Sequence, residues 1–355
     1  MCPLALEMEA NEAIESVVCL TGQHREMLKQ ATDVFNIQVK YDLGIMRGQQ
    51  TLFTLTSDVL LNIEEVLERE KPDIVLVHGD TTTTFTAALA AFYQKIPVGH
   101  VEAGLRTYDK YSPFPEEMNR RLTSQIADIH FAPTEANREN LNREGISKGV
   151  YVTGNTVIDA FKTTVRENYE FHNETLRGLM TGGKMLVLVT AHRRENWGKR
   201  LEQICAALKE LAEIYPDMEF VYPVHLNPAV QETVYGLLSG IERVHLTEPI
   251  DVEDMHNLMS RSYLVLTDSG GLQEEAPAFG VPVLVLRTET ERPEAVEAGT
   301  VRVIGVEKES IVSAVKELAE NKQVYDDMAR AKNPYGDGKA SERIVKHLLE
   351  WYKKR

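Results

Sequence analysis

The chain has 355 residues and a formal net charge of −15 at pH 7, with 43% hydrophobic and 26% charged residues. This length exceeds the usual limit for a single hydrophobic core, which predicts two globular domains. The negative charge argues against general nucleic-acid binding, so any anionic ligand must be held by a local group of cations and helix N-termini. Three cysteines without paired or metal-ligand spacing, and the lack of a long apolar run or a signal-peptide pattern, favour a cytoplasmic protein without membrane contact.

Apolar strands alternate with amphipathic helices along almost the whole chain, which is the pattern of doubly wound parallel sheets. The first set of strands is expected at residues 17–20, 74–77, 98–101, 129–132 and 150–152. The second set is expected at residues 185–189, 220–222, 244–246, 263–266, 281–286 and 301–304. We therefore predict two Rossmann-like α/β domains, residues 1–168 and 169–339, with a polar connector at 168–184. Segment 340–355 fits either domain by its pattern, and we assign it to the first.

Acidic residues follow two strands and begin one helix of the first predicted domain. Asp80 and Glu102 each come shortly after a buried strand, and Glu116 stands where a loop leads into a helix. Each residue also has a simpler explanation. Asp80 could cap the next helix, Glu102 could form a plain salt bridge with Arg106, and an acidic first turn is ordinary helix chemistry.

Two predicted strands of the second domain lead into histidines. His192 is followed by Arg193 and Arg194, and these cationic groups could contact a phosphate or a sugar. A solvated charge cluster is the alternative interpretation. His225 follows the next strand, and a lone histidine is more often a structural group than a ligand.

A strand end, two glycines and a helix start lie together in the segment Ser269, Gly270 and Gly271. The glycines let the backbone turn sharply into a helix expected near Leu272, whose free N–H groups and positive dipole end suit a diphosphate. A plain strand-to-helix turn is the alternative. A second polar loop, which contains Arg292, follows the next strand and is expected at the same sheet edge, where open α/β sheets bind ligands.

Taken in order, these motifs resemble those of the non-hydrolysing UDP-N-acetylglucosamine 2-epimerases. The resemblance runs through nearly the whole chain and is carried by segments 22–28, 153–159, 192–195, 269–271 and 333–338, together with those around Asp80, Glu102 and Glu116. It implies two Rossmann-like domains facing a cleft, as in the B-type glycosyltransferases (the GT-B fold), with the nucleotide bound in that cleft. It also implies a homodimer whose substrate is UDP-N-acetylglucosamine.

The resemblance implies a specific reaction as well. The family eliminates UDP across C1–C2 to give 2-acetamidoglucal and adds UDP back with protonation of the other face, which yields UDP-N-acetylmannosamine. Such a route needs acid and base groups on two faces of the sugar and stabilisation of the departing diphosphate. The family's catalytic positions correspond to Asp80, Glu102, Glu116 and His192. Its UDP- and substrate-binding positions correspond to Arg120, Ser269, Gly270, Gly271, Glu275 and Arg292, with the phosphates on the Ser-Gly-Gly segment and the ribose hydroxyls on Glu275.

This mechanism requires no cofactor and no metal, since helix N-termini and cationic side chains can stabilise the diphosphate. The chain also has no Gly-x-Gly-x-x-Gly motif after a strand and no Walker-type motif. Bacterial relatives are often activated by their own substrate at a second site. The residues that resemble such an allosteric site are Gln23, His24, Gln50, Arg193 and His225.

The resemblance also has one departure. The family begins with a buried strand and a Gly-Thr-Arg-Pro-Glu loop, whereas the residues from Met1 onward match the helix that follows it. We expect the natural start to lie upstream. The alternative functions are a hydrolysing epimerase that releases UDP and N-acetylmannosamine, a glycosyltransferase with the same cleft, and a non-catalytic UDP-sugar-binding protein.

Overall fold

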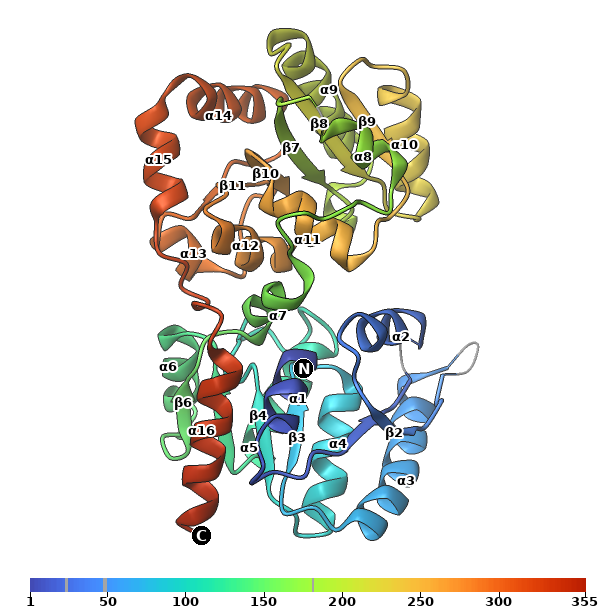
Figure 1. The fold of residues 1–355 in the computed structure, drawn as a ribbon, viewed down its shortest axis with the longest axis vertical. Helices are drawn as coiled ribbons and strands as arrows, with labels where there is room; N and C mark the ends of the chain where they lie inside the picture. The colour runs from blue at the N-terminus through green and yellow to red at the C-terminus, as the bar shows by residue number, and fades with distance from the viewer. Residues whose placement is uncertain (23–24, 47–49, 181) are drawn as a thin grey trace. The chain divides into compact units, whose positions relative to one another are not determined.

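The computed structural model describes residues 1–22, 25–46, 50–180 and 182–355 of the chain (Figure 1). The chain forms two compact α/β units, each containing parallel strands and helices, which confirms the predicted fold class. The first unit comprises Met1–Lys162 and Tyr335–Arg355, and the second comprises Thr163–Pro334. Within the described ranges, none of the helices combines the length and the apolarity that crossing a bilayer requires.

The first unit holds two groups of parallel strands. In one, β1 (Val18–Leu20) pairs with β2 (Val39–Asp42). The other is a four-stranded sheet in the order β3 (Val75–His78), β4 (Val98–Val101), β5 (Ile129–Ala132) and β6 (Val150–Val152). The helices are α1 (Cys2–Glu9), α2 (Arg25–Val34), α3 (Leu52–Glu70), α4 (Thr82–Tyr93), α5 (Glu116–Ile126), α6 (Glu135–Arg143) and α16 (Ala340–Lys353), and α7 (Thr156–Thr164) crosses the boundary between the units.

The central strands β4 and β5 are buried at every position, as expected for parallel strands with neighbours on both edges and cover on both faces. Part of this cover comes from the end of the chain. Ile344 and Leu348 of α16 pack in one apolar cluster with Leu4 of α1 and with Ile129 and Phe131 of β5. Helix α16 therefore belongs to the core of the first unit.

The chain returns to the first unit through a close crossing of two glycines. A Cβ atom on Gly154, which has a φ of +89°, would lie 3.3 Å from the Cα of Gly336 and 3.2 Å from the carbonyl oxygen of Tyr335. The amide of Asn155 donates to the same carbonyl at 2.7 Å. The Asp159 carboxylate accepts from the first two amides of α16 at 3.1 and 2.8 Å. Segments 153–159 and 333–338 therefore have a structural role in tying α16 to this unit.

The second unit is built on a six-stranded parallel sheet. Its strand order is β12 (Val301–Val303), β11 (Val283–Val285), β10 (Leu264–Thr267), β7 (Met185–Thr190), β8 (Met218–Pro223) and β9 (Val244–Thr247). The helices are α8 (Glu174–Leu179), α9 (Lys199–Ile214), α10 (Pro228–Leu238), α11 (Val252–Ser260), α12 (Gly270–Glu275), α13 (Pro293–Glu297), α14 (Lys308–Glu320) and α15 (Lys322–Arg330). Val187, Phe220 and Leu266 of the sheet pack against α9 and α14 in the main core cluster. Because β7 pairs with β10, the loops that follow these two strands leave the sheet side by side.

Candidate active site

Asp80 lies in the turn between β3 and α4 and binds a buried arginine. Its Oδ2 atom is 2.9 Å from Nη2 of Arg120 on α5, and Oε2 of the fully buried Glu117 lies 3.5 Å from Nη1 of the same guanidinium. The cap of α4 is Thr81, whose hydroxyl accepts from the amide of Thr84. Helix capping therefore does not explain Asp80, and the structure places this carboxylate on a guanidinium shared by two acidic groups.

Glu102 directly follows β4 and has a left-handed backbone, with a φ of +64°. This conformation is uncommon outside glycine and costs of the order of 1–3 kcal/mol. Its Oε2 atom lies 3.1 Å from Nε2 of His78, at the end of the neighbouring strand β3. Arg106 donates to Glu144 at 2.8 Å, so its guanidinium is engaged away from the predicted partner. The Glu102 carboxylate thus contacts a histidine, and Arg106 pairs with Glu144 instead.

Glu116 is the first residue of α5 and is partly buried. Arg120 follows it by one helical turn, so the two side chains project from the same face of the helix. Arg120 binds Asp80, so Glu116 begins the helix that carries the partner of Asp80. Glu102 follows the strand next to the one that precedes Asp80. Asp80 and Glu102 therefore lie at neighbouring strand ends, and Glu116 begins the helix that binds Asp80 through Arg120.

A buried carboxylate organises the candidate site of the second unit. Asp268 follows β10 and is fully buried. Its Oδ2 atom accepts from the amides of His192 and Arg193 at 2.8 Å each, and from Nδ2 of Asn196 at 3.0 Å. Its Oδ1 atom lies 3.5 Å from Nδ1 of His192. The loop after β7, which carries the predicted catalytic histidine, is therefore fixed by hydrogen bonds from the neighbouring strand end.

His192 stacks on His225, with ring centroids 5.2 Å apart and an interplanar angle of 11°. Burial lowers the pKa of His192 below its ordinary value, the nearby Asp268 acts in the opposite direction, and His225 and Arg193 lower it further. A lowered pKa keeps the imidazole neutral at pH 7, and a neutral imidazole has one donor and one acceptor nitrogen. His192 is therefore suited to donate to a phosphate oxygen or to exchange a proton.

The turn between β10 and α12 lies beside two arginines, of which Arg292 is also paired with Glu274 and Glu291. Helix α12 begins at Gly270, two residues earlier than the sequence predicted, and the Ser269 hydroxyl makes no capping bond to it. A Cβ atom on Gly270 would lie 3.7 Å from Nη2 of Arg193 and 3.7 Å from Nη2 of Arg292. Two guanidinium groups thus converge on the backbone of the Ser-Gly-Gly segment. Guanidinium groups and helix N–H groups are both ordinary ligands of phosphate.

Glu275 folds back over the same turn. A Cβ atom on Gly271 would lie 3.2 Å from its Oε1 atom, so glycine allows this close approach. On the other side, Oε2 of Glu275 is 3.5 Å from Nε2 of the buried His256. The Nδ1 atom of His256 lies 2.8 Å from the hydroxyl of Thr164, at the start of the second unit. Glu275, the predicted ribose ligand, therefore lies beside the predicted phosphate ligands. Its other carboxylate oxygen contacts the buried His256.

Comparison with known proteins agrees with this arrangement. The model of the family described as UDP-N-acetylglucosamine 2-epimerase matches residues 6–349. The chain is 51% identical to the UDP-N-acetylglucosamine 2-epimerase of Bacillus subtilis over 353 residues, which cover 99% of this chain and 92% of that protein. The chain belongs to the UDP-N-acetylglucosamine 2-epimerase family. The resemblance seen in the sequence is thereby confirmed.

Solved structures of the epimerase family have the same fold. The crystal structure of a putative UDP-N-acetylglucosamine 2-epimerase from Listeria monocytogenes matches with a TM-score of 0.93 and 52% identity, covering 100% of this chain and 93% of that one. The Neisseria meningitidis enzyme, solved with UDP-GlcNAc bound, matches with a TM-score of 0.88 and 50% identity, covering 99% and 96%. A sucrose-phosphate synthase from Thermosynechococcus elongatus, at 11% identity and a TM-score of 0.56, shares the fold alone, which is consistent with a GT-B-like architecture.

The five residues predicted for a second, allosteric site are only partly placed. Gln23 and His24 lie outside the described residues. Gln50 donates its side-chain amide to a carboxylate of α3 at 3.1 Å. Arg193 and His225 both lie next to the predicted catalytic histidine, one in sequence and the other by ring stacking. The structure thus brings two of the five together, in the second unit.

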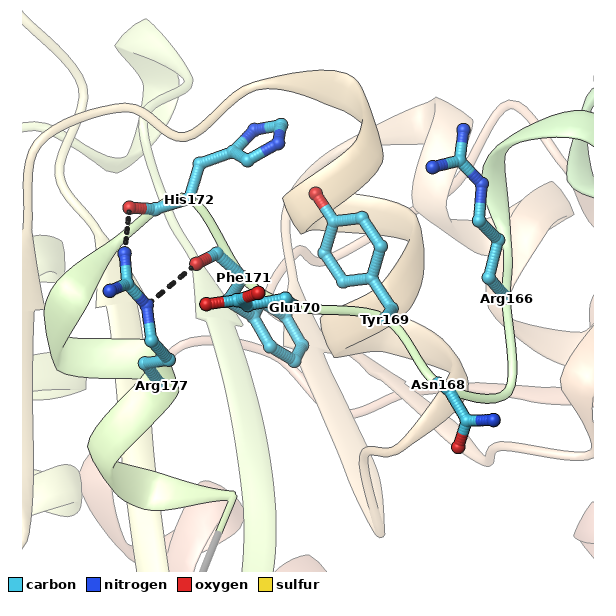
Figure 2. Close-up of a pocket in the computed structure, with 7 residues that line it drawn as sticks. All are labelled: Arg166, Asn168, Tyr169, Glu170, Phe171, His172 and Arg177. Carbon is cyan, nitrogen blue, oxygen red and sulfur yellow. Dashed lines mark hydrogen bonds between the residues drawn. The ribbon is translucent and has the colours of Figure 1, made fainter.

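A surface pocket of about 410 Å³ contains none of the predicted site residues (Figure 2). It lies along the connector and is lined by Arg166, Asn168, Tyr169, Glu170, Phe171, His172 and Arg177. Figure 2 shows that the Arg177 guanidinium donates to the carbonyl oxygens of Phe171 and His172. This arginine therefore stabilises the path of the connector itself.

In the described part of the chain, His172, Asp251 and Asp254 are close enough together to hold a metal ion. Their hydrogen bonds join the connector to α11. The two carboxylate oxygens of Asp254 accept from the Tyr169 hydroxyl and from the amides of His172 and Asn173, at 2.8–2.9 Å. Asp251 caps α11. These bonds tie the connector to α11, and they account for the three side chains without a metal ligand role.

Sequence reasoning missed several residues that hold the site. Glu117, His78 and Asp268 were each adjacent, or nearly so, to a residue that it singled out. His256 lies on α11, away from any motif. His78 and Asp268 could have been recognised because they follow predicted strands. The sequence contains no comparable signal for His256.

Proposed function

We propose that this protein is a non-hydrolysing epimerase that interconverts UDP-N-acetylglucosamine and UDP-N-acetylmannosamine. UDP is eliminated across C1–C2 to give 2-acetamidoglucal and is then added back with a proton delivered to the opposite face of C2. We also propose that the enzyme acts as a cytoplasmic homodimer, as the family resemblance implies. In this proposal the carboxylates of the first unit transfer protons at the sugar. The Ser-Gly-Gly segment of the second unit binds the diphosphate.

The observation that carries the proposal is the pair Asp80 and Glu102, at neighbouring strand ends, in a chain of this family. Each carboxylate has its own basic partner, Arg120 at 2.9 Å and His78 at 3.1 Å. Elimination and re-addition need two proton-transfer groups that keep separate protonation states. The two carboxylates therefore have different surroundings, one beside a charged guanidinium and the other beside an imidazole. Glu116 is proposed as the third proton-transfer group.

The second unit supports the leaving-group half of the proposal. UDP departs as a diphosphate, and its developing charge is stabilised by donors that are already in position. Arg193 and Arg292 converge on Gly270, and the neutral His192 is held beside them by the Asp268 network. We propose that Arg292, His192 and the amides of the Ser-Gly-Gly segment bind the diphosphate. Arg193, which lies beside them, is proposed for the second substrate site. Glu275 is proposed to accept hydrogen bonds from the ribose hydroxyls.

The test is incubation with UDP-N-acetylglucosamine in deuterated water, followed by proton and phosphorus NMR. The proposal expects UDP-N-acetylmannosamine with deuterium at C2, because the proton removed from one face is replaced from solvent on the other. Free UDP with N-acetylmannosamine would identify a hydrolysing enzyme and overturn the proposal. UDP-sugar binding with no turnover would identify a non-catalytic binding protein.

A conservative variant tests the carboxylates directly. Glu102→Gln keeps the size of the side chain and removes its ability to exchange a proton, so kcat should fall by about 10²- to 10⁴-fold. UDP binding, measured by calorimetry, should change little. Glu135→Gln, on an exposed helix position, is the matched control and should behave as wild type. A Glu102→Gln enzyme with wild-type kcat would remove Glu102 from the mechanism.

The same enzyme preparation tests substrate activation. We propose, from the family resemblance, that UDP-N-acetylglucosamine also binds a second, activating site to which Gln50, Arg193 and His225 contribute. The rate should then depend sigmoidally on substrate concentration. A hyperbolic dependence would overturn that part of the proposal and leave the epimerase assignment intact.

A further inference from the structure

The histidine that contacts Glu102 has no role in the proposed mechanism so far. His78 is the last residue of β3, and in the parallel pairing with β4 it lies opposite Val101, directly before Glu102. The register of the two strands thus sets the imidazole beside the carboxylate. The distance from Nε2 to Oε2 is 3.1 Å.

The backbone on both sides of this contact is fixed. The carbonyl oxygen of His78 accepts from the Thr84 hydroxyl at 2.6 Å, which ties the end of β3 to α4. The next carbonyl, that of Gly79, lies 2.8 Å from Nε2 of the buried His100. On the other strand, Glu102 adopts its left-handed conformation while the following amide donates to β5 at 3.0 Å. Both side chains therefore leave the sheet from anchored positions.

The glycine after His78 and the N-terminal amine of Met1 also contribute to the surroundings of the carboxylate. Gly79 has a φ of +69°, and a Cβ atom there would lie 3.6 Å from Oε2 of Glu102. The same oxygen therefore faces both the imidazole and the glycine backbone. One side of the carboxylate therefore faces the end of β3, where the imidazole is its hydrogen-bonding group.

The chemistry of the contact indicates which group donates. Desolvation lowers the pKa of His78 well below its ordinary value, so the imidazole is neutral at pH 7. An ionised carboxylate has only acceptor atoms, so the imidazole must donate through Nε2–H. A neutral imidazole donates a hydrogen bond to the carboxylate without itself adding a positive charge. This differs from the Asp80–Arg120 pair, in which the partner carries a full charge.

We propose that His78 is a positioning residue that orients the Glu102 carboxylate for proton transfer at C2 of the sugar. His78 itself neither gains nor loses a proton during the cycle. The inference rests on the proposed epimerase function, because it assigns the task that Glu102 performs. A fixed base in contact with an orienting donor is the arrangement by which active sites hold a proton-transfer group in productive geometry.

Two polar variants that differ by one methylene group test the proposal. His78→Gln places an amide N–H close to the position of the imidazole Nε2, whereas the shorter His78→Asn leaves its N–H out of reach of Glu102. We expect the Asn variant to lose about 10- to 100-fold in kcat, the cost of a misplaced catalytic group. The Gln variant should retain most of kcat. Because UDP binding requires no proton transfer, KM and the calorimetric Kd for UDP should stay close to wild type in both variants.

The matched control is His245→Asn. His245 makes the same type of contact, from Nε2 to Oε2 of Glu219 at 2.6 Å, on strands of the second unit and outside the proposed machinery. It should leave kcat unchanged. If circular dichroism shows that the His78→Asn variant does not fold, His78→Leu, which fills volume and lacks a donor, takes its place in the same comparison.

Equal kcat values for the Gln variant and the variant without a donor in reach would overturn the inference. So would a loss that appears in KM or in UDP affinity with kcat unchanged, because that pattern belongs to a residue that shapes binding. Failure of the inference is distinguishable from failure of the proposed function. If the wild-type enzyme is active and the His78 variants have the same kcat, only the inference is overturned. If the wild-type enzyme does not exchange the proton at C2, the proposed function itself is overturned.

Discussion

Replacing Asp268 by alanine should destabilise the second unit more than any surface change. The Asp268 carboxylate is fully buried, and its Oδ2 atom accepts hydrogen bonds from the amides of His192 and Arg193 and from the Asn196 side chain. A hydrogen bond to a charged group contributes about 1.5–3 kcal/mol. Three such bonds would amount to about 4.5–9 kcal/mol, and water entering the vacated space recovers part of this. We expect a loss of about 3–5 kcal/mol in the free energy of unfolding.

The assay combines urea unfolding with amide hydrogen exchange. Asp268→Ala should lower the urea midpoint, and the amides of His192 and Arg193 should lose their protection against exchange. Asp326→Ala, in the same unit, is the matched control, because its partners Lys322 and Arg330 are exposed and such pairs contribute about 0–1 kcal/mol. Unchanged protection of the two amides, or an unfolding free energy within about 1 kcal/mol of wild type, would refute the reasoning.

Three further predictions concern other parts of the chain. Gly154→Ala should lower the free energy of unfolding by about 1–3 kcal/mol, because the left-handed backbone of Gly154 lies against the returning chain. Gly236→Ala, within a helix and with open space around it, should raise the free energy of unfolding by about 0.5–1 kcal/mol. Equal thermal midpoints for the two variants would contradict the close crossing at Gly154. The hydrogen bond to Asp251 raises the pKa of His172 above 6.5, so this pair stabilises the fold at low pH and the effect is lost as the pH rises through the folded pKa. NMR titration should show the raised pKa in wild type and its return toward 6.5 in Asp251→Asn; an unchanged value would exclude the pairing. Burial raises the pKa of Cys205 to about 12, so this thiol should resist a thiol reagent at pH 8 until the protein unfolds, and rapid labelling of the folded protein would count against its burial.

The strands that could be predicted from the sequence are those with buried, apolar surroundings. The bounds of β4, β5 and β6 coincide with the predicted residues 98–101, 129–132 and 150–152. The strand β2, Val39–Asp42, was not predicted, because it alternates half-buried and exposed positions and two of its four residues are charged. An edge strand of this type has too little apolar character to be distinguished from a loop.

The sequence predicted those residues of the candidate site that lie directly after a strand. The carboxyl ends of parallel strands meet at one sheet edge, so polar residues such as Asp80 and Glu102 could be singled out from local sequence. The partners that orient them could not. The bond from Asp268 to the amide of His192 spans 76 residues, and the left-handed backbone of Glu102 is rare for its residue type. Both depend on tertiary contacts that a local pattern does not contain.

The close crossing of Gly154 and Gly336 forms late in synthesis, because the returning segment lies near the end of the chain. Asp159 and the first amide of α16 are separated by 181 residues, and all of the second unit is encoded between them. On the ribosome, the second unit therefore emerges complete while the first still lacks the helix that covers Ile129 and Phe131. Domains commonly fold as they emerge, beginning from the N-terminus. In this chain the unit that begins first must finish last, and during that interval its apolar surface depends on chaperones or on loose collapse for protection.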